Sequence, residues 1–476
     1  MSHQHEDTTI SPASSTSSLP KAQLSLIKLV GIAYMYTCGG AYGIEQAVQI
    51  GGSFITIVAL IIAGLIWAVP QAIITAELST TFPQMGSAVY WVEYGLGRRW
   101  GTVNALCSMI GQIFDLALYP GLMVSYASTF IPILNNPGPA FGVQATAVII
   151  IMIANIIGVE LLGSAAQLSN FITLTPFFLL PIVAVVNHNT FDFSSDGPIQ
   201  NTQPLDNWYV FVSTILWTFQ GWSSVGSLAA EVKDSKRSYP LAVILCVSLT
   251  IITYCYPIFF GVALQPDLTQ WNEGYFPTLM GNISTWLGVW VLAGATLANF
   301  SSGLAATALY SRYLQAICQE NFLPLPYLSR TDITKYNTPV PAIIVITIIN
   351  LGLMNLSFDN LVVADSFFNL ISILLVAISF LRLRYTHSEL DRPYQIPGGK
   401  VVAWIITIFT VCIGIGAGYV VSLGAWAQVV GALSTMIVFY GLTIIREKYF
   451  NNNSNSNNNH SKEEKEEEYH TPLLIN

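Results

Sequence analysis

Long apolar stretches alternate with short polar stretches from about residue 27 to residue 445. Most of the apolar stretches reach the length of about 20 residues that a helix needs to cross a hydrocarbon core of about 30 Å. The pattern predicts twelve membrane-spanning helices, at about 27–49, 54–77, 101–130, 143–162, 167–187, 208–228, 241–264, 286–310, 340–357, 363–381, 402–423 and 427–445. We therefore expect an all-α integral membrane protein.

Two of the predicted spans are interrupted by glycines and polar residues. Thr37–Glu45 places three glycines and a carboxylate in the first span, and Phe219–Ser227 places two glycines in the second half of the sixth. A glycine weakens a helix by roughly 1 kcal/mol relative to alanine, and a charge at the membrane centre costs at least about 2.5 kcal/mol. These costs favour broken helices that face a cavity. Small residues that allow close packing of helices are the alternative explanation.

The two interruptions lie five spans apart, which predicts an internal repeat. Spans one to five (25–187) and spans six to ten (208–381) form two halves that enter the membrane from opposite sides, each with a broken first helix; two further spans follow at 402–445. Inverted repeats of this kind bind their ligand near the midplane, where the two breaks meet. Helix N-termini at the breaks would suit a carboxylate and free carbonyl groups would suit an ammonium group. A ligand with both groups is therefore expected.

The breaks supply most of the candidate binding residues. Tyr42, Phe219 and Trp222 could gate the site or stack on an amine, although packing explains buried aromatic residues equally well. Cys38 could line a cavity or be an inert buried thiol. The full set of candidates from the two breaks is Cys38, Gly39, Gly40, Ala41, Tyr42, Gly43, Glu45, Phe219, Gln220, Gly221, Trp222 and Ser223.

Five carboxylates fall within or at the edges of predicted spans, and no lysine or arginine is expected at membrane depth to pair with them. Each must be protonated, bound by neutral donors or exposed to water. Glu45 and Asp115 lie well inside their spans and are our candidates for proton coupling. Glu77, Glu160 and Asp365 lie nearer to span ends, from where their side chains are expected to reach an interface.

Composition and charge agree with a membrane location. The chain is 53% hydrophobic and only 9% charged, whereas soluble domains carry about 25% charged residues. With twelve spans and a cytoplasmic N-terminus, all 18 lysines and arginines fall on the cytoplasmic side, as the positive-inside rule requires. Both termini are therefore predicted to be cytoplasmic. We expect the plasma membrane as the location, with an endosomal or vacuolar membrane as the alternative.

The remaining features argue against several classes of protein. All six histidines lie in predicted loops or tails, so we expect no metal site, no cofactor and no enzyme activity. The cysteines lie in spans or on the cytoplasmic side, so we expect no heavy subunit held by a disulfide; nor do we expect a nucleic-acid partner. Residues 1–24 and 446–476 are polar and predicted to be disordered cytoplasmic tails. Asn282-Ile283-Ser284 is a glycosylation sequon whose use stays open.

Several longer motifs resemble those of the amino acid–polyamine–organocation superfamily of transporters, most closely its polyamine uptake branch. Gly39–Glu45 is similar to that branch's Gly-Gly-Pro-Phe/Tyr-Gly-Val-Glu stretch, with Ala41 where proline is usual. The likeness covers about 25–445. It continues at Gly51-Gly52, Trp67–Glu77, Phe82-Pro83, Asp115–Pro120, Leu228–Val232 and Leu390–Pro397.

The resemblance implies a LeuT-type fold that binds its substrate between spans one, three, six, eight and ten. It implies alternating access, with uptake linked to protons or proceeding by sodium-independent exchange. Glu45, Tyr119 and Phe219–Ser223 would line the pocket. The sixth span departs from the branch, because Gln220-Gly221-Trp222-Ser223 replaces Asn-Tyr-Trp-Asp. The acid that would hold a distal amine is missing, so amino acids and polyamines both stay open as substrates. A nutrient receptor that binds without transport is the remaining alternative.

Overall fold

The structure is a computed structural model that describes residues 25–38, 40–82, 87–158, 164–194, 197–198, 202–204, 206–222, 235–330 and 338–424, with scattered positions between 426 and 444. This part of the chain is helical and contains no strand, as expected of an all-α membrane protein. The predicted disordered tails lie outside the described residues. Most of the predicted last span, 427–445, also lies outside them.

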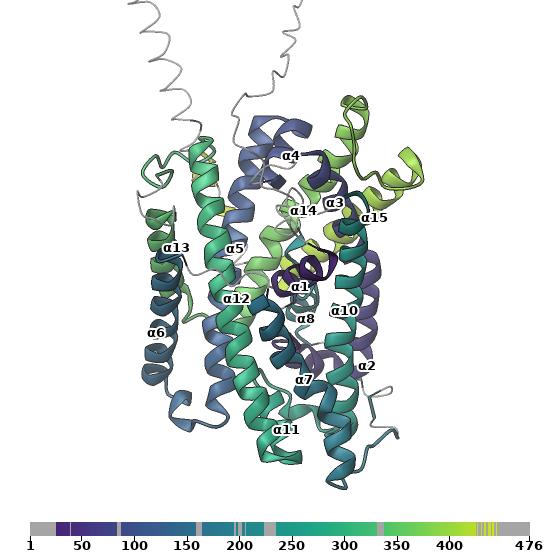
Figure 1. Cartoon of the computed structure of the whole chain (residues 1–476), viewed down its shortest axis with the longest axis vertical. Coiled ribbons are helices and arrows are strands. Elements are labelled where there is room, and N and C mark those ends of the chain that lie inside the picture. Colours follow the sequence, from purple (N-terminus) through teal and green to yellow (C-terminus); the bar gives the residue numbers. More distant parts are fainter. Residues whose placement is uncertain are drawn as a thin grey trace, which may run out of the picture.

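The first half of the chain contains one broken helix and a series of long helices (Figure 1). Helices α2 and α3 run on from each other through the short π-helical turn η1, with a kink at Gly52, where φ is 79°. The elements are α1 (Leu26–Thr37), α2 (Glu45–Ala63), η1 (Gly64–Ala68), α3 (Val69–Thr81), α4 (Ser87–Leu96), α5 (Arg98–Ser128), η2 (Pro132–Asn135), α6 (Pro137–Ile156) and α7 (Ser164–Val186).

The second half also begins with a short helix. Helix α8 has only ten residues, whereas α12 has 35. The elements are α8 (Trp208–Trp217), α10 (Ser235–Leu264), η4 (Leu268–Gln270), α11 (Phe276–Ile283), α12 (Thr285–Gln319), α13 (Val340–Leu353), α14 (Phe358–Thr386) and α15 (Gly399–Gly424). Asn282 of the sequon is exposed near the end of α11.

Eight helical segments of the described chain are long and apolar enough to cross a membrane, and three shorter apolar helices accompany them. The short ones lie at α1, α8 and α13. The boundary predicted between the first two spans is a kink at Gly52 and not a loop, because glycine accepts the positive φ that turns the helix there. The helical content and the apolar spans define a multi-pass membrane protein.

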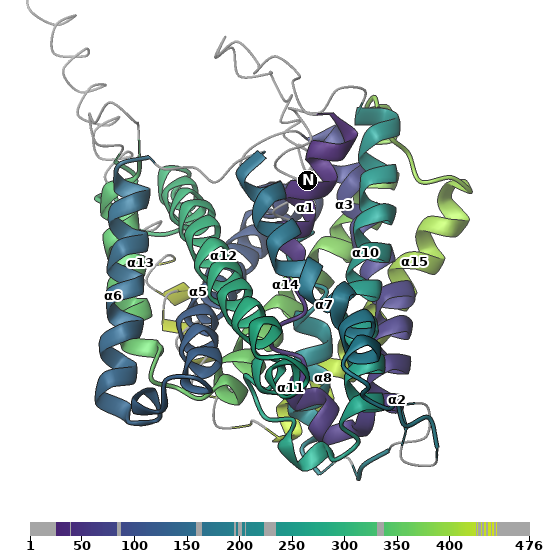
Figure 2. The same cartoon turned by 60° about the horizontal axis from the view of Figure 1, so that its bottom comes forward.

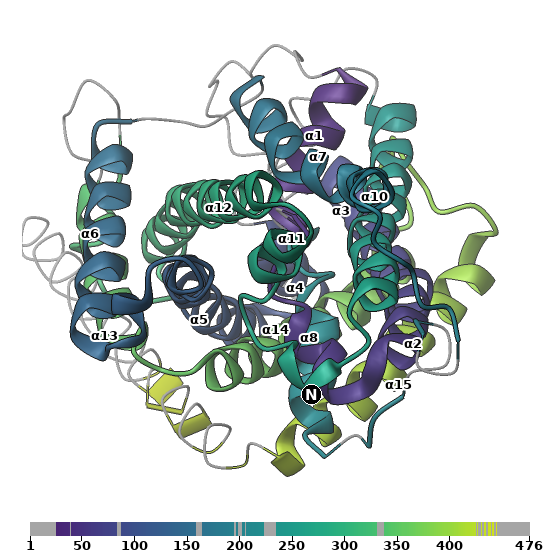
Figure 3. The same ribbon diagram turned by 90° about the horizontal axis from the view of Figure 1, so that it is seen from below.

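The helices enclose a central group that holds both interrupted segments. Helix α5 packs along α12 and α14, and α8 packs against α2 and α14. Helices α6 and α13 lie together at one edge, outside α5 and α12, and the views along and across the bundle agree on this (Figures 2 and 3). The main cluster of buried apolar side chains lies around α1, α2, α8 and α10.

Candidate functional site

The first predicted break is present. Helix α1 ends at Thr37, and α2 begins at Glu45 after a non-helical segment. Gly43 has a φ of 83°, a conformation that side chains with a Cβ atom rarely adopt. A Cβ atom at Gly43 would also lie 2.9 Å from the ring of Trp217, at the end of α8. The first break therefore lies directly against the end of the other short helix.

The second break begins where the sequence predicts it. Helix α8 ends at Trp217, and Gly221 has a φ of 92°. The chain beyond Trp222 is described again only from residue 235. Ser223, which stands where the polyamine uptake branch has an aspartate, therefore lies outside the described residues. Gly39 of the first break lies outside them too. Because a Cβ atom at Gly43 would contact Trp217, the first break lies next to the end of α8, where the second break begins.

A central cavity of about 80 Å³ lies where the breaks meet. A cavity of about 10–15 Å³ is enough for a single water, so this cavity has room for a small organic molecule. Helices α1 and α8 both reach it with their C-terminal ends. It is lined by Met35, Thr37, Cys38, Gly40, Tyr42, Gln112, Asp115, Tyr119, Leu122, Trp217, Gln220, Gly221, Tyr254, Ala298, Asn299, Ser302, Tyr310 and Asn369.

The electrostatics of the cavity favour a positively charged group. A helix C-terminus carries roughly half a negative charge, and two of them meet here. Asp115 of α5 adds a carboxylate that is 7% exposed. In the part of the chain that the structure describes, no lysine or arginine forms an ion pair with it.

Asp115 joins three helices through neutral donors. Its Oδ2 accepts hydrogen bonds from the hydroxyl groups of Tyr119, at 2.9 Å, and Tyr310 of α12, at 2.7 Å. Its Oδ1 accepts one from the indole N–H of Trp217, also at 2.9 Å. The carboxylate is held in one orientation, and Oδ1 keeps a lone pair that can accept from a ligand.

Glu45, the other candidate for proton coupling, lies outside the cavity lining. It is fully buried at the start of α2, where it accepts hydrogen bonds from Tyr126 Oη, at 2.7 Å, and from the backbone N–H of Gly43, at 3.0 Å. This N–H is one of the groups expected at the break to receive a ligand carboxylate. Here the protein's own Tyr126 and Glu45 accept it.

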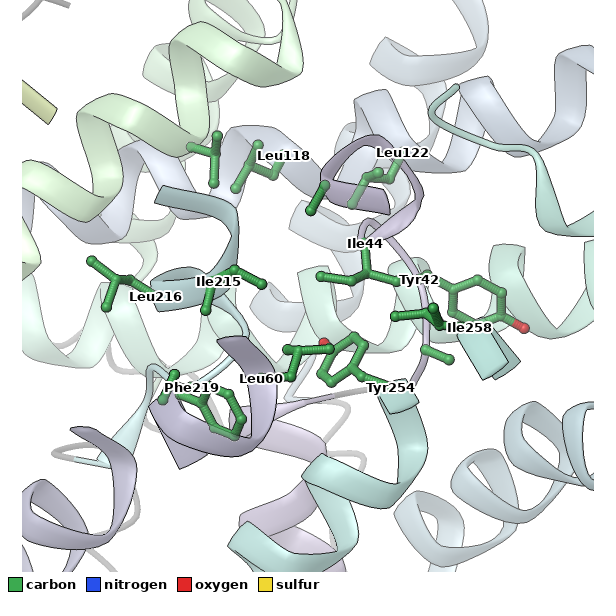
Figure 4. Close-up of a cluster of buried hydrophobic side chains, with 14 of the residues drawn as sticks. Tyr42, Ile44, Leu60, Leu118, Leu122, Ile215, Leu216, Phe219, Tyr254 and Ile258 are labelled. Carbon is green, nitrogen blue, oxygen red and sulfur yellow. The ribbon is translucent and has the colours of Figure 1, made fainter. Parts of the chain in front are cut away.

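The other candidates divide between the cavity and the surrounding core. Cys38, Gly40, Tyr42, Tyr119, Gln220 and Gly221 line the cavity. Ala41 and Phe219 are fully buried core residues, and Figure 4 shows Phe219 in the apolar cluster that also contains Leu60 and Tyr254. Trp222 donates its indole N–H to the carbonyl of Phe219 and lines a second, smaller cavity.

The second cavity adjoins the first. The two share Gln220, Gly221 and Asn369, so the hydrogen bond of 2.6 Å from Asn369 Nδ2 to Gln220 Oε1 forms part of the wall between them. The second cavity continues between α3, α4, α14 and α15.

Sequence reasoning missed several polar cavity residues. Gln112 lies one helical turn before Asp115, so the two share a face of α5, and Asn299 and Ser302 are paired in the same way on α12. This spacing of polar residues within apolar spans was the available signal. Asp365 was expected near an interface, but it is fully buried in α14, where Asn369, one turn later, donates to its Oδ1 at 2.9 Å.

The expectation that no arginine pairs with these carboxylates is wrong for Glu77. Arg384 Nε donates to Glu77 Oε1 at 2.8 Å and its Nη2 to Oε2, and Arg392 Nη1 donates to Oε1 at 3.0 Å. The backbone N–H of Ile396 also donates to Glu77, at 2.8 Å. The segment after α14 folds back over the end of α3, which brings residues remote in sequence to this acid. Glu160 lies outside the described residues.

A helical membrane bundle with a polar cavity at two helix breaks is the form of a membrane transport protein. Comparison with known families makes this specific. The profile of the family described as amino acid permease matches residues 24–445, and the chain therefore belongs to this family. It is a transport protein and not an enzyme.

The chain is also similar to individual transporters over most of its length. It is 29% identical to the polyamine transporter RMV1 of Arabidopsis thaliana, over 86% of this chain and 82% of the relative. It is 29% identical to the polyamine transporter PUT1 of Oryza sativa subsp. japonica, over 79% of this chain and 70% of the relative. The glutamate/serine transporter AimA of Bacillus subtilis is 23% identical, over 80% of this chain and 75% of that protein.

Proposed function

We propose that the protein carries a small amine or amino acid across a membrane by alternating access, with the central cavity as its binding site. The observation that carries this proposal is the position of Asp115, a buried carboxylate without an ion pair among the described residues, at the meeting point of two helix C-termini. The named substrates of the relatives, polyamines, glutamate and serine, all contain an ammonium group. Asp115 is the acceptor for that group.

The remaining cavity residues would position the rest of the substrate. Tyr119, Trp217 and Tyr310 orient Asp115, and Tyr42 and Tyr254 supply aromatic surface for the carbon chain. Asn299 and Ser302 on α12 offer neutral hydrogen-bonding groups on another side of the cavity. Cys38, Gly40, Gln220 and Gly221 bring backbone and side-chain groups from both breaks.

The proposed architecture is a LeuT-type fold of twelve spans. Repeats at 25–187 and 208–381 and a final pair at 402–445 would place the breaks at the midplane, with both termini in the cytoplasm and the plasma membrane as the location. The contact of Gly43 with Trp217 supports the repeat, because each residue belongs to the break of a different half.

We further propose that uptake is coupled to protons through Asp115 or Glu45. Both acids are buried and bound by neutral donors, so gain or loss of a proton changes an uncompensated charge. A proton on Asp115 would compete directly with a substrate ammonium group. Glu45 would act through the start of α2. A sodium-independent exchanger is the alternative, which counterflow without a pH gradient would reveal.

Flux measurements test the proposal. The purified protein is placed in proteoliposomes, and uptake of radiolabelled putrescine and leucine is measured with and without an inward pH gradient, followed by competition with a panel of amino acids and polyamines. Accumulation of one of these classes is expected. Saturable binding without flux would identify a receptor and overturn transport.

A further inference from the structure

A third cavity, of about 310 Å³, is larger than the central one and takes no part in the proposed binding site. It lies at the end of the bundle that holds α11, at the bottom of Figure 1, between the C-terminal half of α5, the start of α6, the loop before α11 and the turn from α13 to α14. Phe141 and Leu356 at its rim are 41% and 44% exposed. This outer cavity is therefore open to the surroundings, and in the proposed topology it faces away from the cytoplasm.

A thin apolar layer separates the outer cavity from the central one. Leu122 is buried and lines both cavities, and Leu118, one turn earlier on α5, lines the outer one; both belong to the apolar cluster of Figure 4. Phe358 also lines the outer cavity. Its ring packs edge to face on that of Trp217, which lines the central cavity, with the ring centroids 5.8 Å apart. One layer of side chains thus lies between the outer cavity and the site of Asp115.

The one carboxylate among the described residues that line the outer cavity belongs to Glu273, in the loop before α11. Ser125 Oγ donates to its Oε1 at 2.6 Å, whereas no described residue donates to Oε2 or forms an ion pair with this acid. Burial, with a smaller contribution from the negative charge of Asp359, raises the pKa of the carboxyl. The ionised form is therefore poorly compensated by the fold, and a cation that enters the cavity is attracted to Oε2.

The composition of the outer cavity favours an organic cation over a metal ion. In the part of the chain that the structure describes, no group of three or more histidine, cysteine or acidic side chains could hold a metal. The volume also far exceeds the about 10–15 Å³ that a single water needs. Gln144, Asn355 and Ser357 add neutral polar groups to the lining. An ammonium group on a carbon chain, with its N–H donors, suits one carboxylate beside neutral acceptors and an apolar wall.

We propose that the outer cavity is an entry site, in which Glu273 binds the ammonium group of the substrate before the substrate reaches Asp115. This inference rests on the proposed function, in which Asp115 holds that group in the central cavity. The two acids lie on opposite sides of the layer that contains Leu122, Phe358 and Trp217. Binding at Glu273 raises the local concentration of substrate at this layer, so it speeds the loading of the central cavity without changing the steps that follow.

The test separates the charge of Glu273 from its hydrogen bond with Ser125. Uptake kinetics are measured in proteoliposomes of uniform orientation, with the outer cavity facing the medium, for whichever of labelled putrescine and leucine the wild type transports. Glu273→Gln keeps an acceptor for Ser125 but loses the charge, so KM should rise about tenfold while kcat stays unchanged. Glu273→Asp keeps the charge on a shorter side chain, so its KM should stay closer to that of the wild type.

Asp267→Asn is the matched control, because Asp267 is an exposed acid of the same loop that lies outside the cavity lining. It should leave KM unchanged. An unchanged KM in Glu273→Gln, an equal rise in Asp267→Asn, or a loss of kcat alone overturns the entry site while transport stands. Normal kinetics in Glu273→Gln with impaired uptake in Glu273→Asp would show that Glu273 serves only as an acceptor for Ser125. Absence of any amine or amino-acid flux in the wild type instead overturns the proposed function.

Discussion

The negative charge of Glu77 is balanced within the protein in a different way from the charges of Asp115 and Asp365. Glu77 is surrounded by Arg384, Arg392 and a backbone N–H, so its charge is fully compensated within the fold. Asp115 and Asp365 contact only neutral donors among the described residues, and one oxygen of Asp365 contacts none. Burial alone therefore does not mark a functional acid. An acid that has no cationic partner among the described residues is the better candidate for binding a cation.

Breaking the Glu77 cluster should have the largest effect on stability. Glu77→Gln leaves Arg384, whose side chain is 2% exposed, as a buried charge without its acidic partner. Removing one partner of a buried pair costs about 3–5 kcal/mol. We expect a much lower unfolding temperature and a smaller monodisperse fraction in detergent.

The pair of Arg98 and Glu93 provides the control for that experiment. It joins side chains at 2.9 Å, but they are 37% and 23% exposed. Glu93→Gln should therefore cost less than about 1 kcal/mol. Equal destabilisation by the two substitutions would contradict a structural role peculiar to Glu77.

Glu45 is intermediate between Glu77 and Asp115 and should affect transport more than stability. In Glu45→Gln the amide oxygen can still accept from the Gly43 N–H, and the amide NH2 group can donate to the Tyr126 hydroxyl, so the start of α2 should remain folded. The charge that responds to protons is lost. We expect reduced uptake, and we expect the ratio of uptake at about pH 5.5 to uptake at about pH 7.5 to be closer to one than in the wild type. A ratio equal to that of the wild type would remove Glu45 from coupling and leave it with a structural role, as the acceptor from Tyr126 and Gly43.

Glu273, in the loop before α11, should give the smallest effect on stability. Burial, with a smaller contribution from Asp359, raises the pKa of its carboxyl, although Ser125 donates to it at 2.6 Å and opposes the shift. Because the folded-state pKa is raised, the stability that the protonated group contributes is present at low pH and is lost as pH rises through that pKa.

Glu273→Gln removes this pH-dependent loss and keeps an acceptor for Ser125. The variant should match the wild type near pH 4 and be more stable at neutral pH, by less than about 1 kcal/mol. Unfolding temperatures at the two pH values measure this. A variant less stable than the wild type at neutral pH would show that the ionised carboxylate is stabilising.

Much of the architecture could be predicted from apolar periodicity and from glycine placement. The ends of α1 at Thr37 and α8 at Trp217 lie where Gly40, Gly43 and Gly221 make a continuous helix costly. The kink at Gly52 could not be told from a loop, because glycine permits both.

The site was harder to predict because its residues come from helices far apart in the chain. Asp115 stood out as a charge inside an apolar span, but its partners Trp217 and Tyr310 belong to α8 and α12. Single polar residues in spans give no information about which helices meet. For the same reason, the sequence did not indicate that Arg384 contacts Glu77, which lies 307 positions earlier.

The most direct test of this account is putrescine and leucine flux into proteoliposomes containing the wild type or Asp115→Asn, matched for protein content and unfolding temperature. Asparagine keeps the size of the side chain and removes the charge that receives an ammonium group. We predict that the wild type accumulates labelled substrate. The uptake rate of Asp115→Asn should be lower by a factor of at least about ten. Equal rates from the two proteins would contradict the assignment of Asp115 as the cation-binding acid of the cavity.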